Sequence, residues 1–221
     1  MKDSGVEWIG EIPEHWGVRK LKHLLSLLKD GSHNPPPRVE SGIKFIPGAT
    51  NIKNSKVIFK NCAHISEEDY FDIHKSYQLQ SNDVLLTIVA TLGNVALVNE
   101  QDLPFSMQRS IAVLRPNSNI TSKFLFYFLH SDYFQNELRA RSHSSVKPGI
   151  YLESLGNIPI VNSTDKNEEI QISQFIDKET KNLDDLISKS QSQINFLQEK
   201  RQALITAAVT GKIDVRNGVA A

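Results

Sequence analysis

Short apolar runs, separated by polar and turn-forming residues, follow one another through the first 165 residues of the chain. The run from Val84 to Val89 is typical, because its β-branched side chains fit a pleated sheet better than a helix. Similar runs recur on both sides of it. The pattern therefore predicts strands over residues 43–46, 57–59, 84–89, 95–98 and 111–114.

One helix is predicted among these strands. Thr121 or Ser122 can cap its start, and apolar side chains recur at helical spacing from Phe124 to Leu138. Its aromatic side chains share one face with leucines, so we interpret them as core rather than as a platform on which bases stack. The first 165 residues thus predict a mixed α/β domain, and the chain as a whole an α+β fold.

A seven-residue repeat replaces this pattern beyond Glu168. Residues 168–210 contain no glycine and no proline, and positions spaced alternately by four and three form one stripe. The stripe comprises Ile176, Thr180, Leu183, Ile187, Ser190, Ile194, Leu197, Arg201, Leu204 and Ala208. This spacing is typical of a coiled coil, and Gly211 is a suitable stop.

A single helix of this length, with one apolar stripe, is not stable alone in water and needs a partner surface. The weakly charged, small-residue end at 203–210 can pack closely against another helix or against the globular domain of its own chain. We therefore predict a domain at residues 1–165, a long helix at 166–212 and a flexible tail at 213–221.

Composition narrows the possible functions. Lys and Arg number 25, as do Asp and Glu, so no global positive field indicates a nucleic-acid partner, although a neutral chain can still carry a basic face. Cys62 is the single cysteine, which excludes an intrachain disulfide and a cysteine-rich zinc site. The N-terminus carries charges where a signal peptide needs an apolar core, and no apolar run reaches membrane-spanning length. We expect a cytoplasmic protein without a membrane partner.

The candidate catalytic motifs lack residues that their chemistry requires. Asn34-Pro35-Pro36 is similar to part of a motif of amino-group methyltransferases, but Pro37 stands where that motif needs an aromatic side chain. Gly93-Asn94 lies between two predicted strands and indicates a hairpin turn rather than a phosphate-binding loop. The seven histidines are dispersed, without metal-ligand spacing. The sequence therefore predicts no enzyme, no cofactor and no metal site.

Several segments resemble the specificity (S) subunits of type I restriction–modification systems. The resemblance begins with KDSGVEWIGEIPEHW at residues 2–16 and continues through residues 30–52, 83–98 and 124–135. It ends with FIDKETKNLDDLI and LQEKRQALITAAVTGKID, which resemble the helical region of that family. The resemblance implies a target recognition domain that reads half of a bipartite site in double-stranded DNA. It also implies docking of methyltransferase (M) subunits, which bind S-adenosylmethionine, with restriction (R) subunits as further partners.

A full S subunit of this family typically has two recognition domains and two long helices that pair antiparallel. This chain has one of each, so the resemblance implies a half-length subunit whose helix forms an antiparallel coiled coil with a second copy. The expected interface residues are Ile176, Leu183, Ile187, Ile194, Leu197, Leu204 and Ala208. The alternative is a truncated S-like protein that binds and modulates M subunits without specific DNA recognition.

Four loops carry the side chains that we expect to contact DNA, because hydrogen-bonding and cationic residues in loops are suited to base edges and phosphates. The candidates are Ser32, His33, Asn34 and Arg38 in the first loop, Thr50, Asn51 and Lys53 in the second, Thr87, Thr91, Asn94 and Arg109 in the third, and Arg139, Arg141, Ser144, Lys147 and Tyr151 in the fourth. Three prolines at 35–37 restrict the first loop. The fourth is the most basic and contains no acid.

Overall fold

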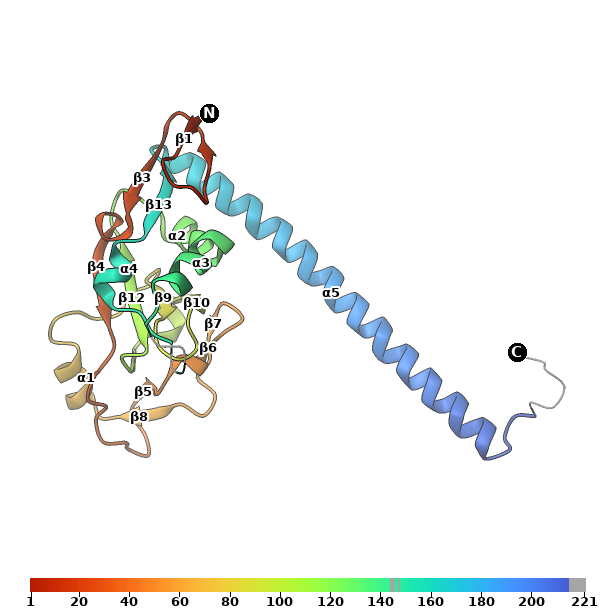
Figure 1. The fold of residues 1–221 in the computed structure, drawn as a ribbon. Coiled ribbons are helices and arrows are strands. Elements are labelled where there is room, and N and C mark those ends of the chain that lie inside the picture. The colour runs from red at the N-terminus through yellow and green to blue at the C-terminus, as the bar shows by residue number, and fades with distance from the viewer. Residues whose placement is uncertain (144–145, 147, 215–221) are drawn as a thin grey trace. The chain divides into compact units, whose positions relative to one another are not determined.

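The computed structural model describes residues 1–143, 146 and 148–214. It divides into two compact units, residues 1–173 and a second that begins at Gln174. The first unit, here the N-terminal unit, is a mixed α/β structure, and the described part of the second is the continuation of one long helix (Figure 1). No helix of the described part is long and apolar enough to cross a membrane.

The strands and helices follow one another as the elements of Figure 1. The strands are β1 (Lys2–Asp3), β2 (Glu11–Ile12), β3 (Trp16–Lys20), β4 (Leu25–Asp30), β5 (Ile43–Ile46), β6 (Ile52–Lys53), β7 (Lys56–Val57), β8 (Ala63–Ile65), β9 (Val84–Thr87), β10 (Val95–Leu97), β11 (Phe105–Met107), β12 (Ile111–Pro116) and β13 (Pro159–Ser163). The α-helices are α1 (Glu67–Ile73), α2 (Ser122–His130), α3 (Asp132–Ala140), α4 (Leu152–Gly156) and α5 (Lys166–Val209), and the 3-10 helices are η1 (Leu21–Leu24), η2 (Ala49–Asn51) and η3 (Glu100–Asp102).

A central antiparallel sheet in the order β10-β9-β12-β4 is buried on both faces. Along β9, Val84 and Leu86 belong to the core that contains α2 and α3, whereas Leu85 belongs to the core formed with β11 and β5. Because successive side chains of a strand point to opposite faces, a strand between two cores must be apolar at every position. This explains the apolar runs at 84–86 and 111–114. The strand predicted at 111–114 is confirmed, and the one predicted at 84–89 is present but ends at Thr87.

Smaller sheets complete the unit. A three-stranded sheet has the order β11-β5-β8, with β11 parallel to β5. Strands β3 and β13 pair antiparallel from Trp16 opposite Ser163 to Lys20 opposite Pro159, and Figure 1 shows them side by side. This pair joins the beginning of the chain to the segment that leads into α5.

The single helix predicted from Phe124 to Leu138 is wrong, because the structure divides it at Ser131. Thr121 caps α2 as predicted, with its hydroxyl accepting a hydrogen bond from the backbone N–H of Phe124. Ser131 has an extended backbone, and its hydroxyl caps α3 by accepting from the N–H of Phe134. The apolar period continues across the break, so periodicity alone did not reveal the second cap. The predicted strand at 57–59 is also displaced, since β7 ends at Val57.

Helix α5 confirms the long helix expected after the globular region. It extends over 44 residues and ends at Val209, and Gly211 follows with φ +69°. The positive φ and the hydrogen bond from the N–H of Lys212 to the carbonyl of Ala207 are typical of a helix that ends at glycine. The predicted tail beyond residue 214 lies outside the described residues.

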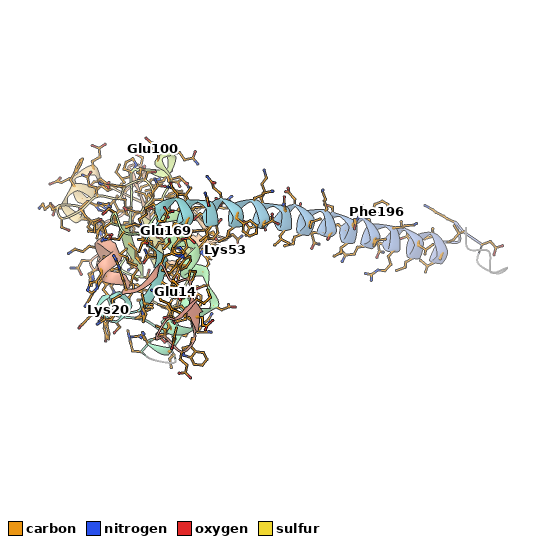
Figure 2. All side chains as sticks on the ribbon, turned by 90° about the horizontal axis from the view of Figure 1, so that it is seen from above. Glu14, Lys20, Lys53, Glu100, Glu169 and Phe196 are labelled. Carbon is orange, nitrogen blue, oxygen red and sulfur yellow. The ribbon has the colours of Figure 1, made fainter. Side chains whose placement is uncertain are left out.

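The apolar stripe of α5 is exposed within the chain. Leu183 and Ile187 retain 57% and 66% of their accessible surface, and the leucines and isoleucines farther along are similarly open. Figure 2 shows the side chains that project from α5, among them Phe196, which is also exposed. The helix therefore presents an apolar stripe, interrupted by Thr180, Ser190 and Arg201, that is not covered within the described part of its own unit.

The first turns of α5 belong to the N-terminal unit and are held there through Glu169 (Figure 2), which is completely buried. Its carboxylate accepts hydrogen bonds from the backbone N–H of Thr121 at 2.7 Å and from Nδ2 of Asn162 at 3.2 Å. Nζ of Lys166 lies 3.3 Å from Oε1 of the same group. A buried carboxylate with these partners fixes the beginning of the helix, because leaving any of them unpaired costs free energy.

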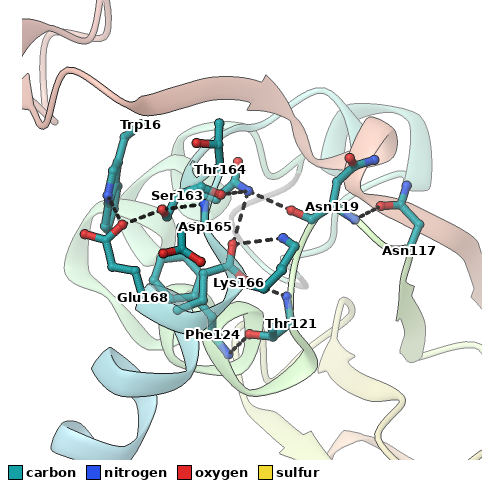
Figure 3. Close-up of polar contacts among 12 residues, drawn as sticks. Trp16, Asn117, Asn119, Thr121, Phe124, Ser163, Thr164, Asp165, Lys166 and Glu168 are labelled. Carbon is teal, nitrogen blue, oxygen red and sulfur yellow. Dashed lines mark hydrogen bonds and ion pairs between the residues drawn. The ribbon is translucent and has the colours of Figure 1, made fainter.

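Glu168 makes a second attachment at the same place. Its Oε2 accepts hydrogen bonds from the hydroxyl of Ser163 and from Nε1 of Trp16 at 3.1 Å (Figure 3). The same oxygen lies 2.8 Å from Nε2 of His15. These hydrogen bonds, that of Ser163 foremost, hold the pKa of Glu168 below its ordinary range against the opposing effect of burial. Glu168 thus connects β3, β13 and α5.

Candidate nucleic-acid interface

The loop after β4 is bound to the turn before β12. The backbone N–H of Ser32 donates to the carbonyl of Met107 at 2.8 Å, and the N–H of Arg109 donates to the carbonyl of Ser32 at 3.0 Å. Gly31 allows this approach, since a Cβ there would lie 2.2 Å from the oxygen of Met107. The first predicted loop and Arg109 of the third are therefore neighbours in space.

The segment after β9 joins the same place. The N–H of Ile88 donates to the carbonyl of Ser110 at 2.9 Å, which connects it to the turn before β12. On its other side, the N–H of Ile150 donates to the carbonyl of Ile88, and the N–H of Ala90 to that of Pro148. Parts of three of the four predicted loops, the first, third and fourth, thus meet at one end of the central sheet.

A cavity of about 410 Å³ lies where these segments meet. Its polar lining consists of Asp30, Arg109, His143 and Tyr151, and its apolar lining of Ile88, Val89, Ile150 and Leu152. The rings of His143 and Tyr151 stack with centroids 4.4 Å apart and an interplanar angle of 13°. Oδ2 of Asp30 lies 2.8 Å from Nε2 of His33. The cavity therefore combines an acid, a cation, stacked rings and an apolar floor.

The first loop presents most of its predicted residues to solvent. His33, Asn34 and Arg38 are exposed, whereas Ser32 is half-buried and donates its hydroxyl hydrogen to the carbonyl of Asn34 at 2.7 Å. That hydrogen bond closes a local turn just before the three prolines. At its other end the N–H of Val39 donates to the carbonyl of His64 at 2.9 Å. The backbone of the loop is thus restrained at both ends and loses little freedom when a partner binds.

Three residues predicted to contact DNA instead hold the backbone of the N-terminal unit. Thr87 is fully buried, and its hydroxyl accepts from the N–H of Asn94 at 2.8 Å. Asn51 is also buried and donates from Nδ2 to the carbonyl of Ile58, while Nδ2 of Asn94 donates to the carbonyl of Ile52. The side chains of Thr87 and Asn51 offer no surface to a duplex, and the amide nitrogen of Asn94 is occupied.

The hairpin of β6 and β7 presents two lysines. Lys53 and Lys56 lie opposite each other in the register of the strands, and both are exposed. The turn between them contains Asn54 and Ser55 with φ of 50° and 61°, and Oγ of Ser55 lies 3.1 Å from Nε2 of His130. Like charges directly opposite in a sheet are destabilising, so this pair is suited to an anionic partner. Lys56 was not among the predicted DNA-contacting residues. The sequence signal that could have identified it is its position two residues after Asn54, a residue type that favours hairpin turns.

The fourth predicted loop begins inside a helix, because Arg139 lies in the last turn of α3 and Arg141 is its C-cap. Of these two arginines, only Arg141 is neutralised by a described acid. Nε of Arg141 lies 2.8 Å from Oε2 of Glu137, and Nη1 of Arg139 donates to Oδ1 of Asn136 at 3.2 Å. Both arginines remain exposed. Ser144 and Lys147 lie outside the described residues. Thr50 and Thr91 are exposed, and the ring of Tyr151 retains 68% of its surface.

The acids of the described residues do not gather into a metal-binding group. No three His, Cys, Asp or Glu side chains in the described ranges could hold one ion together. Asp83 is buried and accepts hydrogen bonds from Nε of Arg115 at 2.7 Å and from the N–H of Gln80 at 2.8 Å. Its buried carboxylate therefore neutralises the half-buried guanidinium of Arg115.

Comparison with known proteins gives consistent matches over most of the chain. A family profile described as "Type I restriction modification DNA specificity domain" matches residues 13–196. The chain is 26% identical over 214 residues to the MjaVIII specificity subunit of a type I restriction enzyme from Methanocaldococcus jannaschii, covering 95% of this chain and 49% of that protein. It is 23% identical over 209 residues to the EcoBI specificity subunit from Escherichia coli, covering 91% and 43%. The chain spans about half the length of the curated relatives it matches.

Solved structures share the fold. A chain from a structure of the assembly and conformational transition of a type I restriction–modification system superposes with a TM-score of 0.71 at 20% identity, covering 90% of this chain and 47% of that one. The HsdS subunit from Thermoanaerobacter tengcongensis gives a TM-score of 0.65 at 19% identity, with 92% and 47% covered. The mixed α/β unit followed by a long helix is thus a known arrangement.

Proposed function

Because the chain belongs to the family of type I restriction–modification DNA specificity domains, we propose that it binds a specific sequence in double-stranded DNA and positions methyltransferase subunits there. The observation that carries the proposal is the meeting of three predicted loops around one cavity with both hydrogen-bond donors and acceptors. Recognition of a base sequence needs such a mixture, because base edges present both kinds of group. The chain itself contributes no catalytic step in this proposal.

The DNA-contacting surface that we propose consists of the exposed members of the predicted set. These are His33, Asn34, Arg38, Thr50, Lys53, Thr91, Arg109, Arg139, Arg141 and Tyr151, with the half-buried Ser32 at its edge. We retain Ser144 and Lys147 from the sequence alone and add Lys56 from the hairpin. Arginine and lysine at the margins are suited to phosphates, whereas the side chains of the cavity are suited to base edges.

We propose three kinds of protein partner. M subunits, which would carry S-adenosylmethionine, dock on the chain and methylate the site, and R subunits join them in a restriction complex. A second copy of the chain covers the exposed stripe of α5, through the predicted interface residues Ile176, Leu183, Ile187, Ile194, Leu197, Leu204 and Ala208. An antiparallel pair of helices would place two recognition units in twofold symmetry, which suits a palindromic bipartite site. All of these partners act in the cytoplasm.

Selection from a randomised duplex library tests the proposal. We expect the purified chain, mixed with its M subunit, to enrich a defined bipartite sequence over successive rounds. Enrichment should disappear when the M subunit is supplied without the chain. If the chain binds the M subunit tightly but the recovered duplexes stay random, the proposal fails. The alternative function, modulation of M subunits without DNA recognition, would then be favoured.

A further inference from the structure

An acidic side chain, that of Asp30, lies within the proposed DNA-contacting surface. The carboxylate of Asp30 lines the cavity, and its Oδ2 lies 2.8 Å from Nε2 of His33. Among the described residues, none donates a hydrogen bond to Oδ1 of Asp30. A carboxylate is repelled by phosphates, so an acid at this place is suited to an amino group on a base edge rather than to the DNA backbone.

Arg109 lines the same cavity. Its side chain is exposed, and no described acid forms an ion pair with its guanidinium. Its backbone is fixed by the hydrogen bond to Ser32 and by the turn in which the N–H of Ile111 donates to the carbonyl of Gln108 at 3.2 Å. Arg109 is therefore a free cation on a rigid turn.

Neighbouring strands hold the two side chains. Asp30 is the last residue of β4 and lies opposite Ala112 of β12, and the N–H of Gly31 donates to the carbonyl of Ile111 at 3.1 Å. Arg109 precedes β12 by two residues. A site on the ends of paired strands keeps its geometry more precisely than one on free loops.

The chemistry of this pair matches one edge of a base pair. In the major groove, guanine presents two acceptors, O6 and N7, and its partner cytosine presents the N4 amino group as a donor. Arginine donates two parallel hydrogen bonds from a planar fork, and aspartate accepts one. Ile88 and Ile150 in the lining of the cavity are buried, and an apolar surface of this kind lowers the local dielectric constant, which strengthens such hydrogen bonds.

We propose that Asp30 and Arg109 together read a single G·C base pair of the recognised sequence. Arg109 donates to O6 and N7 of guanine, and Oδ1 of Asp30 accepts from N4 of cytosine. His33 is a positioning residue, since its ring holds Oδ2 and orients the carboxylate. This inference rests on the proposed function, because it names the base pair that one part of the same DNA surface recognises.

Binding-site selection with variants tests the inference. The wild-type chain in complex with its M subunit should require G·C at one position that both side chains share. Arg109→Ala and Asp30→Asn should each reduce the preference at that position by roughly 10- to 100-fold and leave the other positions unchanged. Asp30→Asn should also shift the preference toward A·T, because an amide group pairs well with adenine.

The variant Arg109→Lys tests whether the preference for guanine depends on positive charge alone or on the planar shape of the guanidinium. Lysine keeps the positive charge but cannot form the planar fork, so the preference for guanine should weaken while affinity for random DNA stays the same. The matched control is Asp72→Asn combined with Arg19→Ala, an exposed acid and an exposed arginine outside the cavity, which should select the wild-type sequence. Thermal unfolding of each variant confirms that it is folded.

Two results would overturn this inference but not the proposed function. In the first, Asp30→Asn and Arg109→Ala change the preference at different base pairs. In the second, either variant selects the wild-type sequence with undiminished preference. A wild-type chain that enriches no sequence would overturn the proposed function as well. The two failures are thus distinguishable in one experiment.

Discussion

Glu168 connects three elements through one carboxylate oxygen, and its ionisation should therefore affect stability. Hydrogen bonds from Ser163, and then from His15 and Trp16, hold its pKa below the ordinary value of about 4.5. A carboxyl group whose pKa is lower in the folded chain contributes stability above its unfolded pKa, and this contribution is lost as the pH falls through its folded pKa. The attachment of α5 to the N-terminal unit should accordingly weaken in acid.

We expect Glu168→Gln to reduce the dependence of thermal stability on pH below about 4.5. At neutral pH the variant should unfold at a lower temperature than the wild type, and the difference should narrow as the pH falls. Thermal unfolding followed by circular dichroism at several pH values measures both effects. Glu100→Gln, in an exposed 3-10 helix, is the control. Parallel curves for wild type and Glu168→Gln would contradict the assigned role.

Single polar residues show why the candidate site was only partly predictable. Thr87 ends an apolar run, where a polar residue indicates a loop, yet its hydroxyl is buried and bound to the N–H of Asn94. The position of Asp30 and Arg109 in the lining of one cavity depends on a sheet register that joins distant parts of the sequence. Residue type could be read from the sequence, but the burial of a hydroxyl and the meeting of two strand ends could not.

Elements were more predictable than sites, because burial leaves a pattern along the chain. Strands β9 and β12 lie between two cores and appear as continuous apolar runs, whereas the short β6, with Ile52 buried and Lys53 exposed, leaves little pattern. The break between α2 and α3 was missed because Ser131 interrupts the backbone without interrupting the apolar period. A serine followed by aspartate at 131–132 was the available signal, since both favour the first turn of a helix.

The hairpin of β6 and β7 should contribute affinity without sequence preference. We expect Lys53→Ala with Lys56→Ala to weaken binding to all duplexes alike and to lower the slope of log affinity against log salt by about 2, because each phosphate contact releases about 0.9 counterion. The selected sequence should not change. Titrations at several salt concentrations measure the slope.

The matched control for the hairpin is Lys178→Ala with Lys181→Ala, two exposed lysines at the same spacing on α5. It should retain the wild-type slope. If the hairpin variant also retains that slope, the hairpin does not contact phosphates. The hairpin variant should be at least as stable as the wild type, since the repulsion between two opposed cations is removed.

At the scale of the whole molecule, the exposed stripe of α5 requires a partner surface that removes its apolar side chains from water. A helix that exposes leucine and isoleucine at heptad spacing associates through that face in water. We expect Leu183→Asp with Leu197→Asp to convert a dimer into a monomer, because each aspartate would place a charge inside the seam. Sedimentation velocity at micromolar concentration measures the change, and the N-terminal unit should keep its unfolding transition.

Ser188→Asp with Gln202→Asp provides the control for charge. These exposed positions have the same separation and lie off the stripe, so the variant should remain dimeric. If the wild type sediments as a monomer, or the Leu183→Asp, Leu197→Asp variant stays dimeric, the stripe is not an interface between two copies. A twofold dimer further implies that the two halves of the recognised sequence are inverted repeats.

Trp16 gives the attachment of α5 an optical signal of its own. Its indole N–H bonds to Glu168, and its ring meets the edge of Phe124 with centroids 5.8 Å apart. The other tryptophan, Trp8, keeps 76% of its surface open, so iodide in solution quenches its emission first. The emission that remains comes from Trp16 and changes when its indole loses the carboxylate of Glu168. Intrinsic fluorescence can thus report, without an attached dye, whether binding of DNA or of an M subunit breaks the contact between Trp16 and Glu168 at the beginning of α5.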